Sequence, residues 1–213
     1  MPPKQAPTAG LPQRAVVFVG PMAAGKTSVG KRVAKELGIP FIDTDARIVQ
    51  RHGAITEIFD KRGEAEFRRI EAEVIAREVN EPGARIVSLG GGALLTESTR
   101  ELLKNHPVIL LMTTEEAVMR TVNLAKRPLL RDDPGAWSRI LEERRHLYEG
   151  AADVTFRTDR TTKESLTRLV VAWLYEYGSD PSAVRFAEEQ PAKPQRRRRR
   201  RGGRRRRNRG SKQ

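Results

Sequence analysis

The sequence predicts an α/β protein of three layers, in which helices cover both faces of a central five-stranded parallel sheet. Between Arg14 and Gly178, strand-length apolar runs alternate with helix-length amphipathic segments, and this alternation is typical of parallel sheets. A glycine-rich loop joins the first predicted strand to the first predicted helix, which is the context that a phosphate-binding loop requires. We therefore expect one folded domain over residues 14–178, with residues 1–13 and 179–213 disordered.

Five segments have the length and composition of buried strands, and six have helical periodicity. The predicted strands are Ala15–Val19, Phe41–Asp43, Arg85–Leu89, Val108–Met112 and Val154–Phe156. The predicted helices are Thr27–Leu37, Glu64–Val79, Glu97–Lys104, Glu115–Leu124, Trp137–Tyr148 and Lys163–Tyr177. In the first helix Val29, Val33 and Leu37 recur every four residues and so share one face. An apolar face of this kind lets a helix pack on the sheet.

The net charge of +14 is concentrated in one short segment. Thirteen of the 41 Lys and Arg residues lie in Pro191–Gln213, which contains no acidic residue. The other 28 basic residues are almost balanced by 27 acidic ones, so the predicted domain is nearly neutral. An arginine run cannot bury apolar surface and repels itself, and for this reason we expect it to be disordered. Such a tail would bind RNA or an acidic protein surface without reading sequence.

Composition also excludes several classes of site. The absence of cysteine excludes disulfides, zinc ribbons and cysteine nucleophiles. The three histidines are scattered, with no ligand-spaced pair. Residues 1–13 lack the pattern of a secretory signal, and the apolar stretches are too short to span a bilayer. We expect a cytoplasmic protein that acts as a monomer and makes no membrane contact.

The loop Gly20–Thr27 reads Gly-Pro-Met-Ala-Ala-Gly-Lys-Thr and fits the phosphate-loop pattern G-x-x-x-x-G-K-[ST]. Backbone N–H groups of such a loop wrap a β-phosphate, and the dipole of the following helix favours the anion. Lys26 would neutralise the β- and γ-phosphate oxygens, and the Thr27 hydroxyl would ligate Mg²⁺. The predicted ATP-binding residues here are Ala23, Ala24, Gly25, Lys26, Thr27 and Ser28. The motif predicts ATP binding but does not identify the acceptor.

Two carboxylates, Asp43 and Asp45, stand at the end of the second predicted strand. Ligands collect at the carboxyl ends of the strands in an open parallel sheet, so both side chains should face the cleft. One carboxylate can hold Mg²⁺ through water, and the other can accept a proton from an attacking hydroxyl. Taken alone, either residue could instead be a helix N-cap.

The segment Phe67–Glu71 reads Phe-Arg-Arg-Ile-Glu and lies on the next predicted helix. An arginine here could clamp a substrate carboxylate through two hydrogen bonds, and Glu71 could orient it. Without the other motifs, the same residues would be interpreted as a surface ion-pair ladder.

Three successive glycines in Ser88–Gly92 follow the third predicted strand. They let the backbone approach a small ligand closely and donate N–H groups to it. The alternative is a plain flexible turn.

Two further motifs carry arginines. Arg127–Leu130 reads Arg-Pro-Leu-Leu and precedes a polar turn, which suits a mobile lid that delivers an arginine to a transferring phosphoryl group. Arg144–Tyr148 reads Arg-Arg-His-Leu-Tyr and returns a basic residue towards the cleft. Each arginine alone would be interpreted as part of a solvated helix face. The order of all the motifs along the chain points to a common site.

This ordered set of motifs resembles that of the shikimate kinase family over residues 15–177. The resemblance implies a phosphate-loop kinase fold with a lid and a substrate-binding helical region. It implies transfer of phosphate from ATP to the 3-hydroxyl of shikimate, in chorismate and aromatic amino-acid biosynthesis. The implied catalytic residues are Lys26, Asp45 and Arg127, with Thr27 and Asp43 serving Mg²⁺. The other implied contacts are Asp45, Arg68, Arg144, Gly90, Gly91 and Gly92 with shikimate, where Asp45 would bind the ring hydroxyls, and Arg120 and Arg127 with ATP.

The chain departs from the family pattern in two places. Many members have glycine where this chain has Ala23, so the loop must tolerate a Cβ there. The loop Thr158–Thr162 matches only loosely, which leaves a nucleotide contact from Arg160 open.

Two other readings remain. A gluconate kinase or a nucleoside monophosphate kinase would share the phosphate loop and the lid, but would not need the glycine triplet and Phe67–Glu71 together. A protein that binds nucleic acid or the ribosome through its basic tail would use the domain only as a scaffold. The tail and a kinase activity can also coexist.

Overall fold

The structure, a computed structural model, describes residues 10–121, 133 and 135–181. Five parallel strands form one sheet in the order β2-β3-β1-β4-β5, which confirms the predicted α/β class. The strands are β1 (Ala15–Val19), β2 (Phe41–Asp43), β3 (Arg85–Ser88), β4 (Val108–Met112) and β5 (Val154–Arg157).

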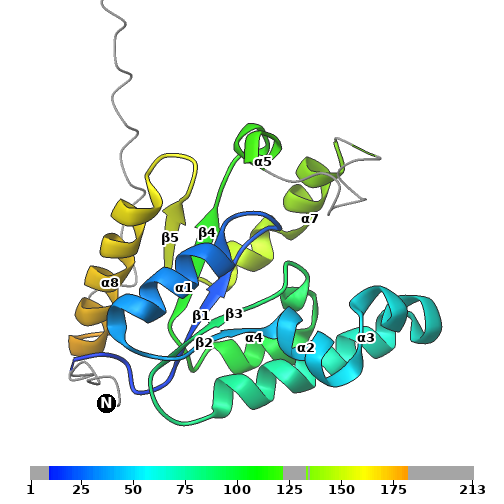
Figure 1. Cartoon of the computed structure of the whole chain (residues 1–213), viewed down its shortest axis with the longest axis horizontal. Coiled ribbons are helices and arrows are strands. Elements are labelled where there is room, and N and C mark those ends of the chain that lie inside the picture. The colour runs from blue at the N-terminus through cyan, green and yellow to red at the C-terminus, as the bar shows by residue number, and fades with distance from the viewer. Residues whose placement is uncertain (1–9, 122–132, 134, 182–213) are drawn as a thin grey trace, which may run out of the picture.

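Helices connect the strands and cover the sheet (Figure 1). They are α1 (Lys26–Leu37), α2 (Thr44–His52), α3 (Ile55–Asn80), α4 (Glu97–Leu103), α5 (Glu115–Thr121), α7 (Ala136–Ala151) and α8 (Lys163–Ser179), with a 3₁₀ turn, η1 (Ala93–Leu95). All six predicted helices are present. The predicted end of the fourth, Leu124, lies outside the described residues.

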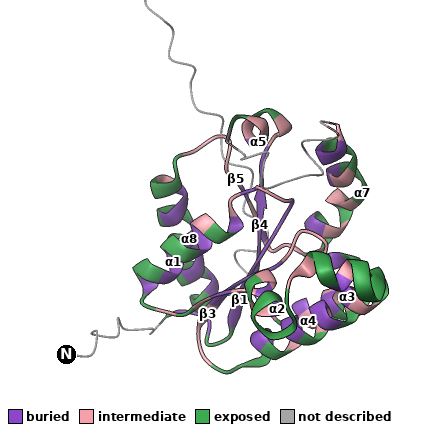
Figure 2. Ribbon diagram, turned by 45° about the vertical axis from the view of Figure 1, so that its right-hand side comes forward, coloured by how far each residue is buried: buried purple, intermediate pink, exposed green. Residues whose placement is uncertain are grey.

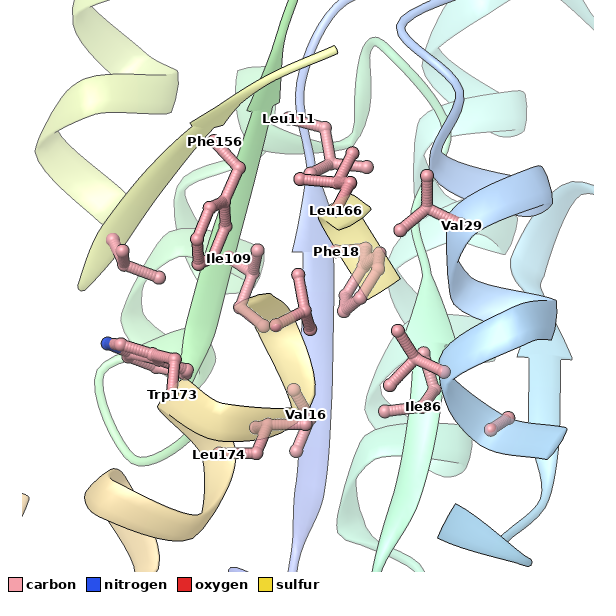
Figure 3. Close-up of a cluster of buried hydrophobic side chains, with 14 of the residues drawn as sticks. Val16, Phe18, Val29, Ile86, Ile109, Leu111, Phe156, Leu166, Trp173 and Leu174 are labelled. Carbon is pink, nitrogen blue, oxygen red and sulfur yellow. The ribbon is translucent and has the colours of Figure 1, made fainter. Parts of the chain in front are cut away.

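Two apolar layers form because alternate residues of each strand point to opposite faces of the sheet. On one face Val16, Phe18 and Ile109 pack against α1 and α8, as Figure 3 shows. On the other face Val17 and Leu110 belong to a second cluster with residues of α3, α4 and α7. In Figure 2 the strands are largely buried and exposed residues lie on the helices around them. The predicted three-layer arrangement is therefore correct.

The region between β2 and β3 contains more helix than the sequence predicted. We predicted one helix over Glu64–Val79, whereas α3 begins at Ile55 and continues through a kink at Gly63, where φ is 80°. The helix α2 was missed because only Thr44 and Ile48 are buried along it, too few to give a clear periodicity. In the missed half of α3, Ile55, Ile58 and Phe59 do follow helical spacing, and they form a small third core with Phe67.

Both ends of the described chain meet at the C-terminal part of α8. Leu11 is buried in the core, although the domain was predicted to begin only at Arg14. A Cβ on Gly178 would lie 2.1 Å from the carbonyl oxygen of Gly10, so the N-terminal segment crosses α8 in direct backbone contact. Among the described residues, no helix combines the length and apolar composition needed to span a bilayer.

Candidate active site

The carboxyl ends of β1, β2 and β3 enclose a cavity of about 280 Å³. Its lining residues come from the phosphate loop, the start of α2 and the glycine triplet: Met22, Ala23, Gly25, Lys26, Thr27, Ser28, Asp43, Asp45, Ser88, Leu89, Gly90 and Gly91. Three predicted motifs that are far apart in sequence therefore line the same cavity. It lies where ligands bind in open α/β sheets, beside the central strand β1.

The phosphate loop leaves β1 and turns sharply into α1. Gly20 has a φ of 134°, and a Cβ there would lie 2.3 Å from the carbonyl oxygen of Leu111, so only glycine fits. Lys26 is buried, and its ammonium donates to the carbonyl oxygens of Gly20 and Pro21 at 2.7 and 2.9 Å. The lysine thus folds back across the loop, where its charge faces the space that the loop encloses.

Ala23 is the one non-glycine residue with a positive φ, 62°, in the part of the chain that the structure describes. Its Cβ is accommodated, as the sequence required, but in the left-handed region. That conformation costs an alanine on the order of 1–2 kcal/mol relative to its usual ones. The loop therefore stores strain at the position where the family resemblance led us to expect that a Cβ must be tolerated.

Thr27 and Asp43 place two oxygen atoms together at the edge of the cavity. The Thr27 hydroxyl donates to Oδ2 of Asp43 at 2.8 Å. The other carboxylate oxygen accepts from the backbone N–H of Ala46 at 3.3 Å and caps α2. The N-cap alternative is correct for Asp43, but it uses only one of the two oxygens. A hydroxyl and a carboxylate are suitable ligands for Mg²⁺, which usually takes few protein ligands and keeps waters and substrate phosphates.

Asp45 and Glu71 crowd against Gly90. A Cβ on Gly90 would lie 2.6 Å from Oδ1 of Asp45 and 3.0 Å from Oε1 of Glu71. The glycine therefore allows two carboxylates from different helices to approach the turn. The alternative interpretation of these glycines, a plain flexible turn, does not explain this packing.

Arg68 points to the same turn, whereas its neighbour Arg69 points to solvent. Arg68 donates to Oε2 of buried Glu71 at 2.6 Å, and its guanidinium lies against Gly92. Arg69 is exposed and pairs with Glu66 at 2.7 Å. The ion-pair-ladder interpretation thus describes Arg69, and the clamp interpretation fits the position of Arg68.

Burial raises the pKa of Glu71 above its ordinary value, although the hydrogen bond and charge of Arg68 lower it. The nearby carboxylate of Asp45 also raises it. The carboxylate of Glu71 orients Arg68 through their hydrogen bond, although burial removes water that would otherwise solvate it. The sequence suggested this orienting role from the spacing of one helical turn.

Side chains of α7 donate hydrogen bonds to both the phosphate loop and the glycine triplet. Arg144 donates to the carbonyl oxygen of Gly91 at 3.3 Å, and the hydroxyl of Tyr148 donates to the same oxygen at 2.5 Å. Near the start of α7, the indole N–H of Trp137 donates to the carbonyl oxygen of Met22 at 3.0 Å. The predictions included Arg144 but gave no role to Tyr148 or Trp137, because both follow the apolar stripe of the helix and resemble ordinary core residues.

A second cavity, of about 270 Å³, adjoins the phosphate loop on the side of β5. Ala23, Ala24, Gly25 and Ser28 form one wall, and Thr113, Ala117, Thr158, Thr161 and Lys163 are among the residues of the others. The loosely matching loop after β5 thus reaches this cavity through Thr158 and Thr161, while Arg160 is not among the lining residues. The sequence had indicated the loop but not these threonines.

Of the two arginines predicted to contact ATP, Arg120 lies within the described residues and Arg127 does not. Arg120 is exposed on α5, one turn beyond Ala117, and its Nε donates to the carbonyl oxygen of Glu116 at 3.1 Å. Arg120 is not among the residues that line the second cavity, although Ala117 on the same helix is. Arg127 and the predicted lid lie outside the described residues.

A parallel sheet, a phosphate loop and an acceptor pocket at the same sheet edge define a phosphate-loop kinase that acts on a small molecule. A family model described as shikimate kinase matches residues 22–175. The chain belongs to the shikimate kinase family.

Curated relatives match nearly their whole length. A shikimate kinase of Streptomyces coelicolor is 45% identical over 156 residues, which cover 72% of this chain and 91% of that protein. A shikimate kinase of Corynebacterium efficiens is 43% identical over 169 residues, or 78% of this chain and 97% of that protein. The predicted family is confirmed.

Solved structures of other proteins are also similar to this chain. A shikimate kinase from Acinetobacter baumannii in complex with shikimate has a TM-score of 0.72 and 32% identity, covering 79% of this chain and 97% of that one. A gluconokinase from Sinorhizobium meliloti has a TM-score of 0.55 and 20% identity over 80% of this chain and 97% of that one. The second likeness shows a shared fold alone.

Proposed function

We propose that the chain transfers the γ-phosphoryl group of ATP to the 3-hydroxyl of shikimate, yielding 3-phosphoshikimate and ADP. One observation carries the proposal: the glycine triplet lies between a phosphate loop and a pair of arginines. Gly90 contacts Asp45 on one side of the turn, and Gly92 contacts Arg68 on the other. Shikimate is a carboxylate that bears ring hydroxyls, so it needs cations and hydroxyl acceptors within a few ångströms of each other.

The carboxylate of shikimate would bind Arg68 and Arg144. Both guanidinium groups lie at the glycine triplet, and Arg68 is oriented by Glu71 at 2.6 Å. Arg68 also pairs with exposed Glu64 at 3.2 Å, a weak surface interaction that a substrate carboxylate can replace. Backbone N–H groups of Gly90–Gly92 would complete the contact, while Asp45 would accept hydrogen bonds from the ring hydroxyls.

Phosphoryl transfer would proceed in line between the bound hydroxyl and the γ-phosphate. Asp45 would accept the proton of the attacking hydroxyl. Lys26 would exchange the carbonyls of Gly20 and Pro21 for oxygens of the β- and γ-phosphates. Mg²⁺ bound at Thr27 and Asp43 would neutralise charge on the phosphate oxygens. Arg127 would add a further positive charge as the lid arginine.

The second cavity suits the adenine base. It adjoins the phosphate loop and offers both the apolar wall of Val29 and Leu166 and the polar groups of Thr158 and Thr161. Mixed apolar walls with a few polar groups are typical of small-ligand sites. Arg120, which follows the lining residue Ala117 by one turn of α5, would stack on the exposed face of the base.

An acceptor panel tests the proposal. ADP release by the full-length chain is measured with ATP and Mg²⁺ in the presence of shikimate, gluconate, a nucleoside monophosphate or no acceptor. The proposal predicts turnover that depends on shikimate. Turnover with gluconate or the nucleotide, and none with shikimate, would favour the other kinase classes and overturn the substrate assignment.

The arginine-rich segment supports a second, compatible function as an RNA-binding tail. Its 13 cationic residues from Pro191 to Gln213 are accompanied by no acidic residue. Binding of this type falls steeply with salt, because cations on the protein displace condensed counterions. Labelled RNA should bind the full chain at low salt, and substitution of the arginines of 196–201 and 204–207 by serine should abolish binding. Equal binding by both chains would remove the tail function.

We further propose that the enzyme acts as a monomer in the cytoplasm. Every residue proposed to bind ATP, Mg²⁺ or shikimate belongs to this chain, so the proposed site requires no residue from a second subunit. Light scattering of the purified full-length chain should give a mass near 24.0 kDa. A stable mass of twice that value would contradict it.

A further inference from the structure

The phosphate loop contains a strained turn formed by residues 21–24. The backbone N–H of Ala24 donates to the carbonyl oxygen of Pro21 at 3.3 Å, so Met22 and Ala23 occupy the two central positions. The second central residue, Ala23, has a φ of 62°. Positive φ at that position is typical of type II turns, which favour glycine there because a Cβ is disfavoured in the left-handed region.

Type I and type II turns differ mainly in the direction of the peptide group between the two central residues. Here that group consists of the Met22 carbonyl and the Ala23 N–H. The indole N–H of Trp137 donates to the Met22 oxygen at 3.0 Å. Rotation of this peptide to the type I direction would turn the oxygen away and break the hydrogen bond. The bond therefore favours the strained turn over the relaxed one.

The environment of Trp137 makes this hydrogen bond hard to replace. The residue is 2% exposed and belongs to the apolar cluster against which Met22 and Ala23 pack. A buried donor that loses its acceptor is left unsatisfied, which adds to the penalty of rotating the peptide.

The same hydrogen bond sets the direction of a backbone donor. The carbonyl and N–H of a trans peptide point in opposite directions, so the Ala23 N–H points away from α7. Met22 and Ala23 both line the cavity of the phosphate loop, and Ala23 lines the second cavity as well. The direction of this peptide therefore shapes the surface that a nucleotide phosphate meets.

We propose that Trp137 is a positioning residue for nucleotide binding, which holds the Met22–Ala23 peptide in the strained orientation that this chain must adopt with alanine at position 23. The proposal rests on the nucleotide site of the proposed function. It predicts an interdependence: Trp137 should matter while residue 23 is alanine and matter much less when that residue is glycine, which reaches positive φ without a Cβ penalty.

The test is a double-mutant cycle on ADP affinity, measured by calorimetry with Mg²⁺ and the full-length chain and without shikimate. Trp137→Phe removes the N–H donor and keeps an aromatic ring. It should weaken ADP binding about fivefold, the effect of one hydrogen bond of ordinary net strength. Ala23→Gly changes the binding loop itself, so its own ADP affinity serves as the reference for the double variant. Adding Trp137→Phe to Ala23→Gly should weaken ADP binding less than about twofold.

Trp173→Phe is the matched control. Trp173 is also buried, at 4% exposure, but it lies on the α1 and α8 side of the sheet, and its Nε1 has no hydrogen-bond partner among the described residues. This variant should leave ADP affinity unchanged. Thermal melting of each variant checks folding, and Trp137→Met, which fills the space without a donor, replaces Trp137→Phe if that variant does not fold.

Equal weakening by Trp137→Phe in the Ala23 and Ala23→Gly backgrounds would overturn the proposal, as would no weakening at all. A native chain that binds no ADP would overturn this inference together with the nucleotide site. ADP binding without shikimate phosphorylation would remove only the proposed acceptor and would leave this inference standing.

Discussion

The guanidinium of Arg68 lies so close to Gly92 that a Cβ there would come within 2.6 Å of Nη1 and 2.7 Å of Nη2. The third glycine of the triplet is thus explained by a side chain from another helix. Because the obstructing atoms are the end of a flexible side chain, an added methyl group would displace the arginine rather than unfold the turn.

Gly92→Ala should therefore damage substrate binding more than stability. Displacement of one charged clamp should raise the KM for shikimate about tenfold or more, with little change in the KM for ATP. Steady-state kinetics with each substrate varied, together with thermal melting, measures both effects. Gly150→Ala is the control, because a Cβ on Gly150 would meet nothing within 4 Å. An unchanged KM for shikimate in Gly92→Ala would remove Arg68 from the substrate site.

Two substitutions of Asp43 should separate its two roles. Asparagine still caps a helix but is a poorer ligand for Mg²⁺, so Asp43→Asn should raise the Mg²⁺ requirement about tenfold or more with little loss of stability. Asp43→Ala should lose the cap as well, and with it about 1 kcal/mol of the free energy of unfolding. Magnesium titrations of activity and urea unfolding compare the two variants. Equal stability of both would show that capping of α2 does not depend on this side chain.

The buried carboxylate of Glu71 should make stability depend on pH. Burial raises its pKa in the folded state above the ordinary value of 4.5, so the folded chain binds more protons than the unfolded chain just above that pH. The free energy that protonated Glu71 contributes is present below pH 4.5 and is lost as pH rises through the folded-state pKa. Glu71→Gln, which cannot ionise, should escape this loss.

The melting temperature of Glu71→Gln minus that of the native chain should consequently increase as pH rises from about 4 towards 7. Scanning calorimetry over this range measures the difference. Glu73→Gln, at an exposed position on the same helix, is the control and should show no such trend. A difference that falls with rising pH would mean that Arg68 lowers the pKa of Glu71 by more than burial raises it.

Arg127→Ala tests the lid role that the family resemblance implies. A lid arginine acts on charge that develops during transfer, and its loss should lower kcat by about 10³-fold. The KM for shikimate should change far less. An unchanged kcat would remove Arg127 from the transition state.

Local patterns in the sequence were sufficient to predict the sheet and most of its helices. The strands Ala15–Val19 and Val108–Met112 are continuous apolar runs, and the structure reproduces their bounds. The helix α2 escaped prediction because it is held mainly by contacts with α3, including a hydrogen bond from Arg51 to Glu78 at 2.8 Å. Such tertiary contacts leave no periodic signal in the sequence.

The site was predictable where its residues form motifs and unpredictable where they act across the fold. The contact of Gly90 with Asp45 joins two predicted motifs, but nothing in either one gives their distance. The contact of Trp137 with Met22 spans 115 positions and joins a core residue to a loop carbonyl. Backbone conformation at Ala23 was equally hidden, because sequence shows that a Cβ is present but not the φ it must adopt.

We propose that this chain phosphorylates the 3-hydroxyl of shikimate, with Asp45 beside the phosphate loop as the proton acceptor. The most direct measurement is ³¹P nuclear magnetic resonance of a reaction of the full-length chain with ATP, Mg²⁺ and shikimate, run beside Asp45→Asn. The native chain should convert shikimate to 3-phosphoshikimate with equimolar ADP, and the variant should bind ATP but form almost no product. Absence of phosphorylated shikimate from the native reaction, or normal turnover by Asp45→Asn, would contradict the account.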